Sequence, residues 1–304
     1  LLKHASNVPG CALAIEEVFR EAGFPPHVFQ ALLIGSGEAE AVIAHDKVKA
    51  VTLTGSTQAG RSVAAKAGSL IKKTVLELGG SDPYLILEDA DLEKAAEICV
   101  NARLVNSGQS CIAAKRFIVV KAVEKEFIGI FKDLMQQKKT GDPLEKDTDV
   151  GPQARAGLRD RLHEQVLESI VRGAKCLLGG QKPEGKGAFY PPTILANVKK
   201  GMPAYEEEMF GPVAAVISAR NEEEAIRIAN DTSFGLGAAV FTRNKKKGEE
   251  IAAHRLEAGC CFVNGLVHSD PRLPFGGIRE SGYGRELGSF GIREFVNIKT
   301  VYVT

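Results

Sequence analysis

Short apolar runs alternate with amphipathic helical segments along the chain, and this alternation limits the fold more than any other feature. The apolar runs lie at residues 48–53, 72–78, 84–87, 115–120, 175–178, 213–217, 237–241 and 260–263. Helical spacing of apolar residues is found at 12–22, 57–67, 91–104, 123–138, 153–172, 222–230 and 245–256. Strands that alternate with helices pair mostly in parallel, so we expect an α/β fold with a largely parallel sheet. Apolar and polar residues also alternate at 295–303, which predicts a terminal strand that pairs with another subunit.

Composition and charge exclude several classes of function. The 304 residues include 39 Lys and Arg against 38 Asp and Glu, and a net charge of +1 gives no electrostatic basis for binding nucleic acid or an anionic membrane. No apolar run approaches the ~20 residues that a membrane-spanning helix needs. Six scattered cysteines form no CxxC pair and six isolated histidines form no HxH or HExxH pattern, so we predict neither a disulfide framework nor a metal site. Reduced thiols favour a cytoplasmic location.

A glycine-rich turn follows the apolar run at 48–53. It contains Gly55, Ser56, Thr57 and Gly60. Glycine lets a ligand approach the backbone, and free N–H groups at a helix start bind phosphate. The turn lacks the G-x-G-x-x-G fingerprint of dinucleotide sites, and an ordinary turn with a Ser or Thr cap is the alternative.

Cys111 follows the small polar segment NSGQS at 106–110, which is typical of a loop. A substrate can reach a thiol there, whereas Cys99 falls on the apolar side of its helix. A reactive thiol needs a nearby base or backbone N–H groups to form a thiolate. Cys111 is therefore a candidate nucleophile, with an inert cysteine as the alternative.

Two glutamates are candidates for a role beside this thiol. Glu77 ends the run at 72–78, and ligand sites of open α/β sheets gather at the carboxyl ends of strands. Its two leucine neighbours favour a raised carboxyl pKa, which suits a general base, whereas a glutamate exposed at the rim is the alternative. Glu208 ends a run of three glutamates just before Phe210-Gly-Pro, which predicts a tight turn that fixes one acid beside an aromatic ring. A solvated acidic face is the alternative there.

Taken together, these segments closely resemble the aldehyde dehydrogenase superfamily over essentially the whole chain. The shared motifs are LTGST at 53–57, LELGG at 76–80, GQSC at 108–111, EEMFGP at 207–212, LPFGG at 273–277 and SGYGRELG at 281–288. Each motif is weak alone, but their order and the 34-residue separation of Glu77 from Cys111 are specific. The segment SDPRLPF at 269–275 makes the chain most similar to bacterial NAD(P)-dependent succinate-semialdehyde dehydrogenases.

The resemblance implies the NAD(P)-dependent oxidation of an aldehyde, succinate semialdehyde above all, to the carboxylic acid. Cys111 would attack the aldehyde carbon, a hydride would pass to NADP or NAD, and Glu77 would activate the water that hydrolyses the resulting thioester. The Cys111 backbone N–H would donate to the oxyanion. The residues implied for cofactor binding are Lys3, Ser6, Gly55, Ser56, Gly60, Leu78, Glu208 and Phe210, and those implied for the substrate are Arg103, Ser269 and Phe275.

Ser6 bears on the choice of cofactor. It stands three residues after Lys3, where NAD-preferring members of the superfamily often carry a glutamate. A carboxylate at that place bonds the ribose hydroxyls and repels a 2′-phosphate. A neutral hydroxyl removes the repulsion, so we expect the chain to accept NADP.

The chain also departs from the superfamily pattern. We expect the N-terminal portion to be missing, together with the asparagine that completes the oxyanion hole, and the loss of one such donor lowers a rate ~10²–10³-fold. Val105 replaces an arginine that binds the substrate carboxylate in some members, and Ala113 replaces a second cysteine, so no disulfide switch is predicted. A truncated, non-catalytic homologue or inactive fragment that acts only as a structural or binding subunit is the alternative. A thiol that hydrolyses activated esters without nicotinamide is a third.

The expected architecture is a two-lobed aldehyde-dehydrogenase-like fold with parallel-sheet cofactor and catalytic domains. Residues 1–79 would form the C-terminal part of the cofactor-binding domain, residues 80–279 the catalytic domain, and residues 280–304 a return segment with an oligomerisation strand. A hinge is expected at the GGSDP segment, 79–83. We expect a homodimer or homotetramer, because closed symmetric assemblies remove exposed sheet edges.

Overall fold

A computed structural model describes all residues, 1–304, and divides into two compact units. The smaller unit comprises Leu1–Thr52 and Arg61–Thr74, and the larger unit comprises Leu53–Gly60 and Val75–Thr304. These boundaries differ from the division at residues 79 and 280 that we expected from the sequence. The end of the strand at 73–77 belongs to the larger unit because Leu76 and Glu77 pair with residues 282–283 in an antiparallel ladder.

The smaller unit contains a short parallel pair of strands, two complete helices and most of a third helix, Thr57–Ser69. Its elements are β1 (Leu2–Lys3), α1 (Pro9–Glu21), β2 (Ala31–Leu32), η1 (Ser36–Glu38) and α2 (Ala39–Ala44). β1 pairs with β2 in parallel, and the ring of Phe19 stacks on Phe29 with a centroid separation of 4.8 Å. The helix predicted at 12–22 is confirmed as α1. β2 and α2 were not predicted, because two and six residues are too few to show a periodic pattern.

The larger unit is built on a seven-stranded sheet with the order β11-β10-β5-β6-β9-β8-β7. All neighbouring strands are parallel except β7 and β8. The strands are β5 (Pro83–Ile86), β6 (Arg116–Val120), β7 (Lys175–Leu178), β8 (Thr193–Ala196), β9 (Val213–Ala219), β10 (Gly237–Phe241) and β11 (Cys260–Val263). The predicted α/β class with a largely parallel sheet is confirmed. β8 was not predicted.

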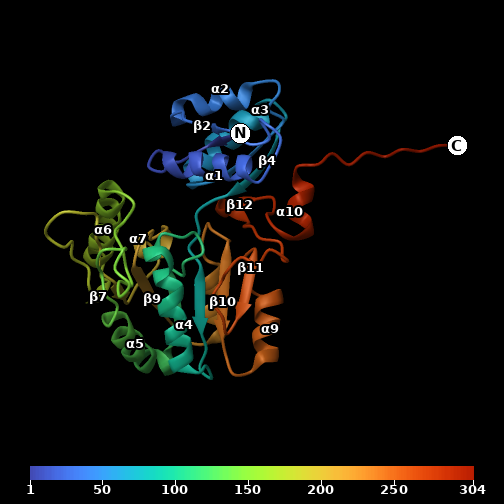
Figure 1. Ribbon diagram of the computed structural model, residues 1–304. Helices are drawn as coiled ribbons and strands as arrows, with labels where there is room; N and C mark the ends of the chain where they lie inside the picture. The colour runs from blue at the N-terminus through green and yellow to red at the C-terminus, as the bar shows by residue number, and fades with distance from the viewer. The chain divides into compact units, whose positions relative to one another are not determined.

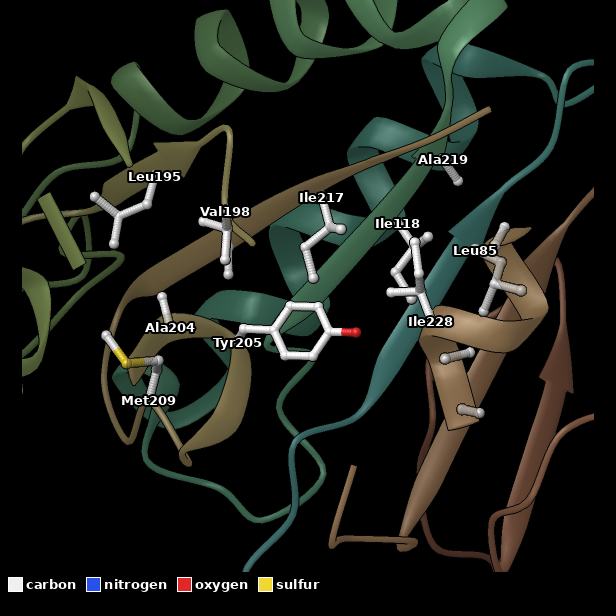
Figure 2. Packing of buried hydrophobic residues seen from close by; sticks show 14 of the residues in the cluster. Leu85, Ile118, Leu195, Val198, Ala204, Tyr205, Met209, Ile217, Ala219 and Ile228 are labelled. Carbon is white, nitrogen blue, oxygen red and sulfur yellow. The ribbon is translucent and has the colours of Figure 1, made fainter. Parts of the chain in front are cut away.

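Helices cover both faces of this sheet. They are α4 (Leu92–Leu104), α5 (Lys121–Gln136), α6 (Ala156–Val171), α7 (Pro203–Glu206), α8 (Glu222–Asn230) and α9 (Lys245–His254). Successive strand residues point to opposite faces, so Leu85 and Ile118 pack in one core with α6 and α8, and Tyr84 and Phe117 pack in the other with α4 and α5. Figure 2 shows Leu85, Ile118 and Ile217 in the first of these cores. β5 and β6 are therefore buried on both faces, which explains why they are apolar without alternation.

The remaining elements include a three-stranded sheet with the order β12-β4-β3. They are β3 (Ala50–Thr54), α3 (Thr57–Ser69), β4 (Lys73–Glu77), η2 (Val105–Gly108), η3 (Arg279–Ser281), β12 (Gly282–Tyr283) and α10 (Gly288–Glu294). None of the helices in the structure is both long enough and apolar enough to cross a lipid bilayer.

Residues 295–303 form no strand in the single chain, where the expected partner subunit is not present. The chain leaves α10 and continues with no other strand beside it (Figure 1). A strand needs a partner for its N–H and C=O groups, and no free sheet edge lies alongside this segment. Pairing of this segment with another subunit stays a prediction.

Arg116 supports the core through a buried set of hydrogen bonds. It begins β6, is fully buried, and donates to the carbonyl oxygens of Ser81 at 3.0 Å, Ile228 at 3.0 Å and Ala229 at 2.9 Å. Two of these carbonyls end α8, where the helix dipole favours a cation. Burial lowers the pKa of Arg116 to about 10, so the guanidinium stays charged at neutral pH.

Replacement of Arg116 by Met tests this support. Arg116→Met leaves the buried carbonyls of Ser81 and Ala229 without a donor, while that of Ile228 keeps the Asp231 N–H, and we expect the free energy of unfolding to fall by about 2–4 kcal/mol. Urea unfolding followed by circular dichroism measures the change. The control is Arg220→Met, because Arg220 is exposed and pairs with Glu224 at the surface. Equal shifts in the two unfolding midpoints would contradict the proposed support.

Candidate active site

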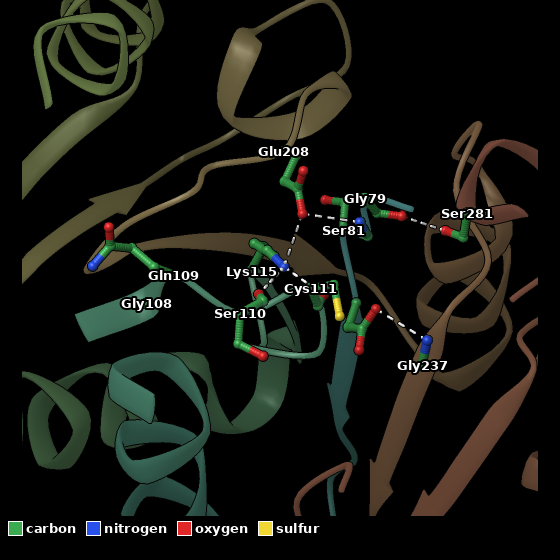
Figure 3. A network of polar contacts seen from close by, with 12 residues as sticks. Gly79, Ser81, Gly108, Gln109, Ser110, Cys111, Lys115, Glu208, Gly237 and Ser281 are labelled. Carbon is green, nitrogen blue, oxygen red and sulfur yellow. Dashed lines mark hydrogen bonds and ion pairs between the residues drawn. The ribbon is translucent and has the colours of Figure 1, made fainter. Parts of the chain in front are cut away.

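The segments that precede β5, β6, β9 and β10 meet at one edge of the seven-stranded sheet, because parallel strands begin on the same side. They carry Asp82, Cys111, Glu208 and Leu236, each a few residues before its strand. Figure 3 shows part of this cluster, in which Lys115 lies between Cys111 and Glu208. The site is therefore assembled from four segments that are distant in the sequence.

The loop before Cys111 has an unusual backbone. Asn106, Ser107 and Gly108 have φ values of +50°, +57° and +76°, in the left-handed region. This region costs a residue with a Cβ about 1–2 kcal/mol. Neighbouring groups hold the loop: Ser107 Oγ accepts from the Gly151 N–H at 2.9 Å, and Gln109 Oε1 accepts from the Ala154 N–H at 2.8 Å. The loop thus presents a half-buried Cys111 from a fixed backbone.

Arg103 does not occupy the place that we expected of a substrate-binding residue. It is fully buried, and its guanidinium donates to the carbonyl oxygens of Gly108 at 2.9 Å and Val213 at 3.3 Å. Burial lowers its pKa to about 9. The expectation is corrected: Arg103 is directed into the protein and fastens the Cys111 loop to β9.

Lys115 is a polar residue of the site that the sequence analysis did not single out. Its side chain is fully buried, and Nζ donates to the carbonyl oxygens of Cys111 at 2.6 Å and Ser110 at 2.9 Å. The same ammonium lies 3.5 Å from Oε1 of Glu208, which also accepts from the Gly80 N–H at 3.0 Å. A lysine directly before a buried apolar strand and four residues after a candidate nucleophile was the available signal.

The surroundings of the Cys111 thiol shift its pKa in opposite directions. Burial raises the pKa of the Cys111 thiol, and the carboxylates of Asp82, Glu208 and Glu77 add to this. The Lys115 ammonium lowers the same pKa. Because the raising effects prevail, the cysteine is a thiol at neutral pH and needs a base in order to react as a thiolate.

Glu77 ends β4, as expected, and it is not exposed at the rim. Only 3% of its surface is accessible, and neither carboxylate oxygen has a hydrogen-bond partner within the chain. Burial, with a smaller contribution from Glu286, raises the pKa of Glu77 to about 7, although Arg285 opposes the shift. The charge of Glu77 also acts on Cys111, so the two groups are within electrostatic reach. A buried carboxyl that titrates near neutrality has the properties of a general base.

The glycine-rich turn lies beside the end of β4. The Gly55 N–H donates to the Glu77 carbonyl at 2.9 Å, and Ser56 Oγ accepts from the Ala59 N–H at 3.3 Å near the start of α3. A Cβ on Gly60 would lie 2.5 Å from a methyl group of Leu78, so only glycine lets the helix pack this closely. The structure therefore brings Gly55, Gly60 and Leu78 together.

Glu208 lies next to the segment that follows β4. A Cβ on Gly79 would lie 2.6 Å from Glu208 Oε2, and Ser281 Oγ donates to the Gly79 carbonyl at 2.6 Å. Phe210 is half-buried two residues beyond Glu208. Glu208 is thus held beside Phe210 by contacts within the chain, and it does not belong to a solvated acidic face.

The other residues implied by the resemblance lie in different surroundings. Lys3 and Ser6 belong to the smaller unit, where Lys3 Nζ donates to the His4 carbonyl and Ser6 is exposed. Ser269 is exposed on the loop after β11, and Phe275 is buried, with its N–H and carbonyl paired to Glu286. The roles of all four residues stay predictions.

Comparison with known proteins places the chain in a family. The profile of the aldehyde dehydrogenase family matches residues 1–301. The chain belongs to the aldehyde dehydrogenase family. The expected aldehyde-dehydrogenase-like fold is also confirmed, because the crystal structure of the succinic semialdehyde dehydrogenase from Streptococcus pyogenes in complex with NADP+ superposes with a TM-score of 0.97. That protein is 39% identical, and the match covers 99% of this chain and 66% of that one.

Curated aldehyde dehydrogenases give a consistent picture. A probable NADP(+) succinate-semialdehyde dehydrogenase of Synechocystis sp. is 52% identical over 303 residues, which are 100% of this chain and 66% of that protein. The NAD(P)+ succinate semialdehyde dehydrogenase Sad of Escherichia coli is 48% identical, over 99% of this chain and 65% of that protein. The chain thus spans about two thirds of the length of these relatives.

The raised pKa of Glu77 predicts a dependence of stability on pH. The folded state binds the proton more tightly than the unfolded state, whose pKa is near 4.5. The stabilising effect of this proton is present below that value and is lost as the pH rises through about 7. Glu77→Gln removes the loss, so we expect it to stabilise the chain at pH 8 by about 2–3 kcal/mol relative to its effect at pH 5.

Urea unfolding at several pH values measures this difference. The control is Glu97→Gln on the exposed surface of α4, which should show no such dependence on pH. A Glu77→Gln variant whose stability follows that of the unmodified chain at every pH would contradict the assigned burial.

Proposed function

We propose that this chain catalyses the NADP- or NAD-dependent oxidation of an aldehyde to the carboxylic acid, with Cys111 as nucleophile and Glu77 as general base. The observation that carries the proposal is the buried Glu77 carboxyl, whose two oxygens have no partner, within electrostatic reach of the Cys111 thiol. Structural glutamates that are this deeply buried normally have hydrogen-bond partners. Membership of the aldehyde dehydrogenase family supports the same reaction.

Cys111 forms the covalent bond to the substrate. Its thiol proton passes to water, and the resulting thiolate sulfur adds to the aldehyde carbon, because only the thiolate is the nucleophile. The backbone N–H of Cys111 makes no hydrogen bond to any acceptor in the chain. It is therefore available to donate to the aldehyde oxygen as negative charge develops there.

Glu77 receives protons in the site. With a pKa of about 7, a substantial fraction of its carboxyl groups is ionised near neutral pH. An unpartnered carboxylate oxygen can accept a proton from the water that attacks the Cys111 thioester. This hydrolysis releases the carboxylic acid and restores the thiol, so Glu77 sets the protonation requirement of the second half of the reaction.

Residues beside β4 fit the nicotinamide cofactor. Gly55 and Ser56 stand at the start of α3, where free N–H groups suit a pyrophosphate, and Gly60 lets that helix approach Leu78. Glu208 presents a carboxylate, which suits a ribose hydroxyl, beside Phe210. When bound, the cofactor accepts the hydride that leaves the substrate carbon. The NADP(+) and NAD(P)+ in the names of the relatives support this assignment.

The proposed substrate is an aldehyde with a carboxylate at its far end, such as succinate semialdehyde. The names of the curated relatives support this class. Ser269 is exposed and has a hydroxyl that suits the substrate carboxylate, and Phe275 offers an apolar surface. Val105 is 44% exposed and carries no charge, so any arginine that binds the carboxylate must come from elsewhere.

Reduction of NADP in the presence of succinate semialdehyde tests the proposal. The purified chain should form NADPH, and Cys111→Ala should abolish its formation, since no other group supplies the nucleophile. Cys176→Ala is the control, because Cys176 is exposed on the edge strand β7 and should be dispensable.

Three results of this assay would contradict the proposal. NADPH formation by Cys111→Ala would exclude Cys111 as the nucleophile. A folded chain that reduces neither NADP nor NAD with any aldehyde would favour a non-catalytic subunit. Cleavage of an activated ester that depends on Cys111, without any reduction of NADP, would favour a thiol hydrolase.

Ser6→Glu tests the choice of cofactor. A carboxylate at this position would repel the 2′-phosphate of NADP and bond the ribose of NAD. We expect the ratio of kcat/KM for NADP to kcat/KM for NAD to fall at least ~10-fold, which corresponds to ~1.4 kcal/mol. Ser36→Glu, also exposed in the smaller unit, is the control. An unchanged ratio in Ser6→Glu would remove Ser6 from the cofactor site.

A further inference from the structure

Lys115 has a buried charge that the proposed reaction does not use. The burial of an ammonium group carries a desolvation penalty, and an apolar side chain of similar volume would avoid it. Burial accordingly lowers the pKa of Lys115. A lysine ammonium has three donors, and here three acceptors surround it: the Ser110 carbonyl, the Cys111 carbonyl and Glu208 Oε1.

We propose that Lys115 is a positioning residue that holds the Cys111 loop and the Glu208 carboxylate in one fixed arrangement. The inference rests on the proposed function, because it assigns Lys115 to the support of that nucleophile and that cofactor carboxylate. Lys115 acts on the nucleophile through the backbone carbonyls of Ser110 and Cys111, and on the cofactor site through the Glu208 carboxylate.

On the side of the nucleophile, Lys115 fixes the direction of a peptide group. Its Nζ lies 2.9 Å from the Ser110 carbonyl oxygen. In a planar trans peptide the C=O of Ser110 and the N–H of Cys111 point in opposite directions. A held Ser110 carbonyl therefore aims the Cys111 N–H away from Lys115, and this N–H is the proposed donor to the oxyanion. The second bond, to the Cys111 carbonyl at 2.6 Å, fixes the next peptide group as well.

On the side of the cofactor, Lys115 shares one carboxylate oxygen with a backbone donor. Oε1 of Glu208 accepts from the Gly80 N–H at 3.0 Å and lies 3.5 Å from Lys115 Nζ. Oε2 of Glu208 has no hydrogen bond within the chain. It lies so close to Gly79 that a Cβ added to that glycine would be 2.6 Å from Oε2. Anchoring of Oε1 thus leaves Oε2 for a ribose hydroxyl.

The charge of Lys115 also acts on the thiol. The groups that influence the Cys111 pKa are Lys115, which lowers it, and Asp82, Glu208 and Glu77, which raise it along with burial. Removal of the Lys115 charge would therefore leave only burial and the acidic groups to act on the thiol, and both raise its pKa. The alkylation of Cys111 should then require a higher pH.

The test measures Cys111 alkylation and NADP binding, neither of which needs turnover. Iodoacetamide alkylates the purified chain across a range of pH, and mass spectrometry follows the peptide that contains Cys111. For Lys115→Met we expect the midpoint of alkylation to move up by about one pH unit. For Lys115→Arg, which keeps the charge, we expect most of that shift to be reversed. NADP affinity from calorimetry should fall about tenfold in Lys115→Met, since Glu208 loses its anchor.

The control is Lys121→Met, because Lys121 is exposed at the start of α5 and pairs with Glu124. A folded Lys115→Met with the alkylation midpoint and NADP affinity of the unmodified chain would overturn the proposal. If Lys115→Met does not fold, Glu208→Gln tests the cluster from its other end. Loss of that carboxylate should lower the alkylation midpoint, and an unchanged midpoint would overturn the proposal.

These outcomes separate the inference from the proposed function. An alkylation midpoint that shifts in a chain without dehydrogenase activity would contradict only the proposed function. Normal NADPH formation in the unmodified chain, with no shift in Lys115→Met, would contradict only the positioning role.

Discussion

Parallel pairing in the seven-stranded sheet places the starts of β5, β6, β9 and β10 along one edge. The candidate active site depends on this geometry. The irregular segments before β5, β6 and β9 carry Asp82, Cys111 and Glu208, and the shared direction of the strands brings these groups together. Both faces of the sheet are covered by helices, so the edge is the place where polar side chains can gather without disrupting the core.

Three buried cations hold the irregular segments in place. Arg103, Lys115 and Arg116 are each fully buried, and each donates to main-chain carbonyls rather than to a substrate. Irregular backbone cannot satisfy its own carbonyls as a helix does, so long side chains with several donors do this work. The left-handed residues Asn106 and Ser107 are stable only because their surroundings fix them. A preorganised Cys111 loop is the result, and such preorganisation is where catalytic sites gain most of their effect.

The sequence predicted the elements with a clear period, and the roles of the residues in the ordered motifs stay predictions. α1, β5, β6 and the parallel sheet follow from apolar patterning, and Glu77 was placed correctly at a strand end. Two-residue strands and the four-residue α7 escape any periodic analysis. Arg103 was misassigned because sequence distance from Cys111 says nothing about the direction of a side chain. Lys115 was missed because a lysine before a strand normally marks an exposed edge, and only the tertiary structure shows that it is buried. The terminal alternation at 295–303 gives no strand in the single chain, since a strand forms only where a partner exists.

The central claim is that Cys111 carries the substrate as a thioester whose hydrolysis needs Glu77. The most direct measurement is acid-quenched mass spectrometry of the Glu77→Gln chain after it is mixed with succinate semialdehyde and NADP. Because hydrolysis is slowed while attack by sulfur is not, the account predicts a succinyl group on the peptide that contains Cys111, formed together with one equivalent of NADPH. Stoichiometric NADPH with an unmodified Cys111, or a succinyl group on another residue, would contradict it.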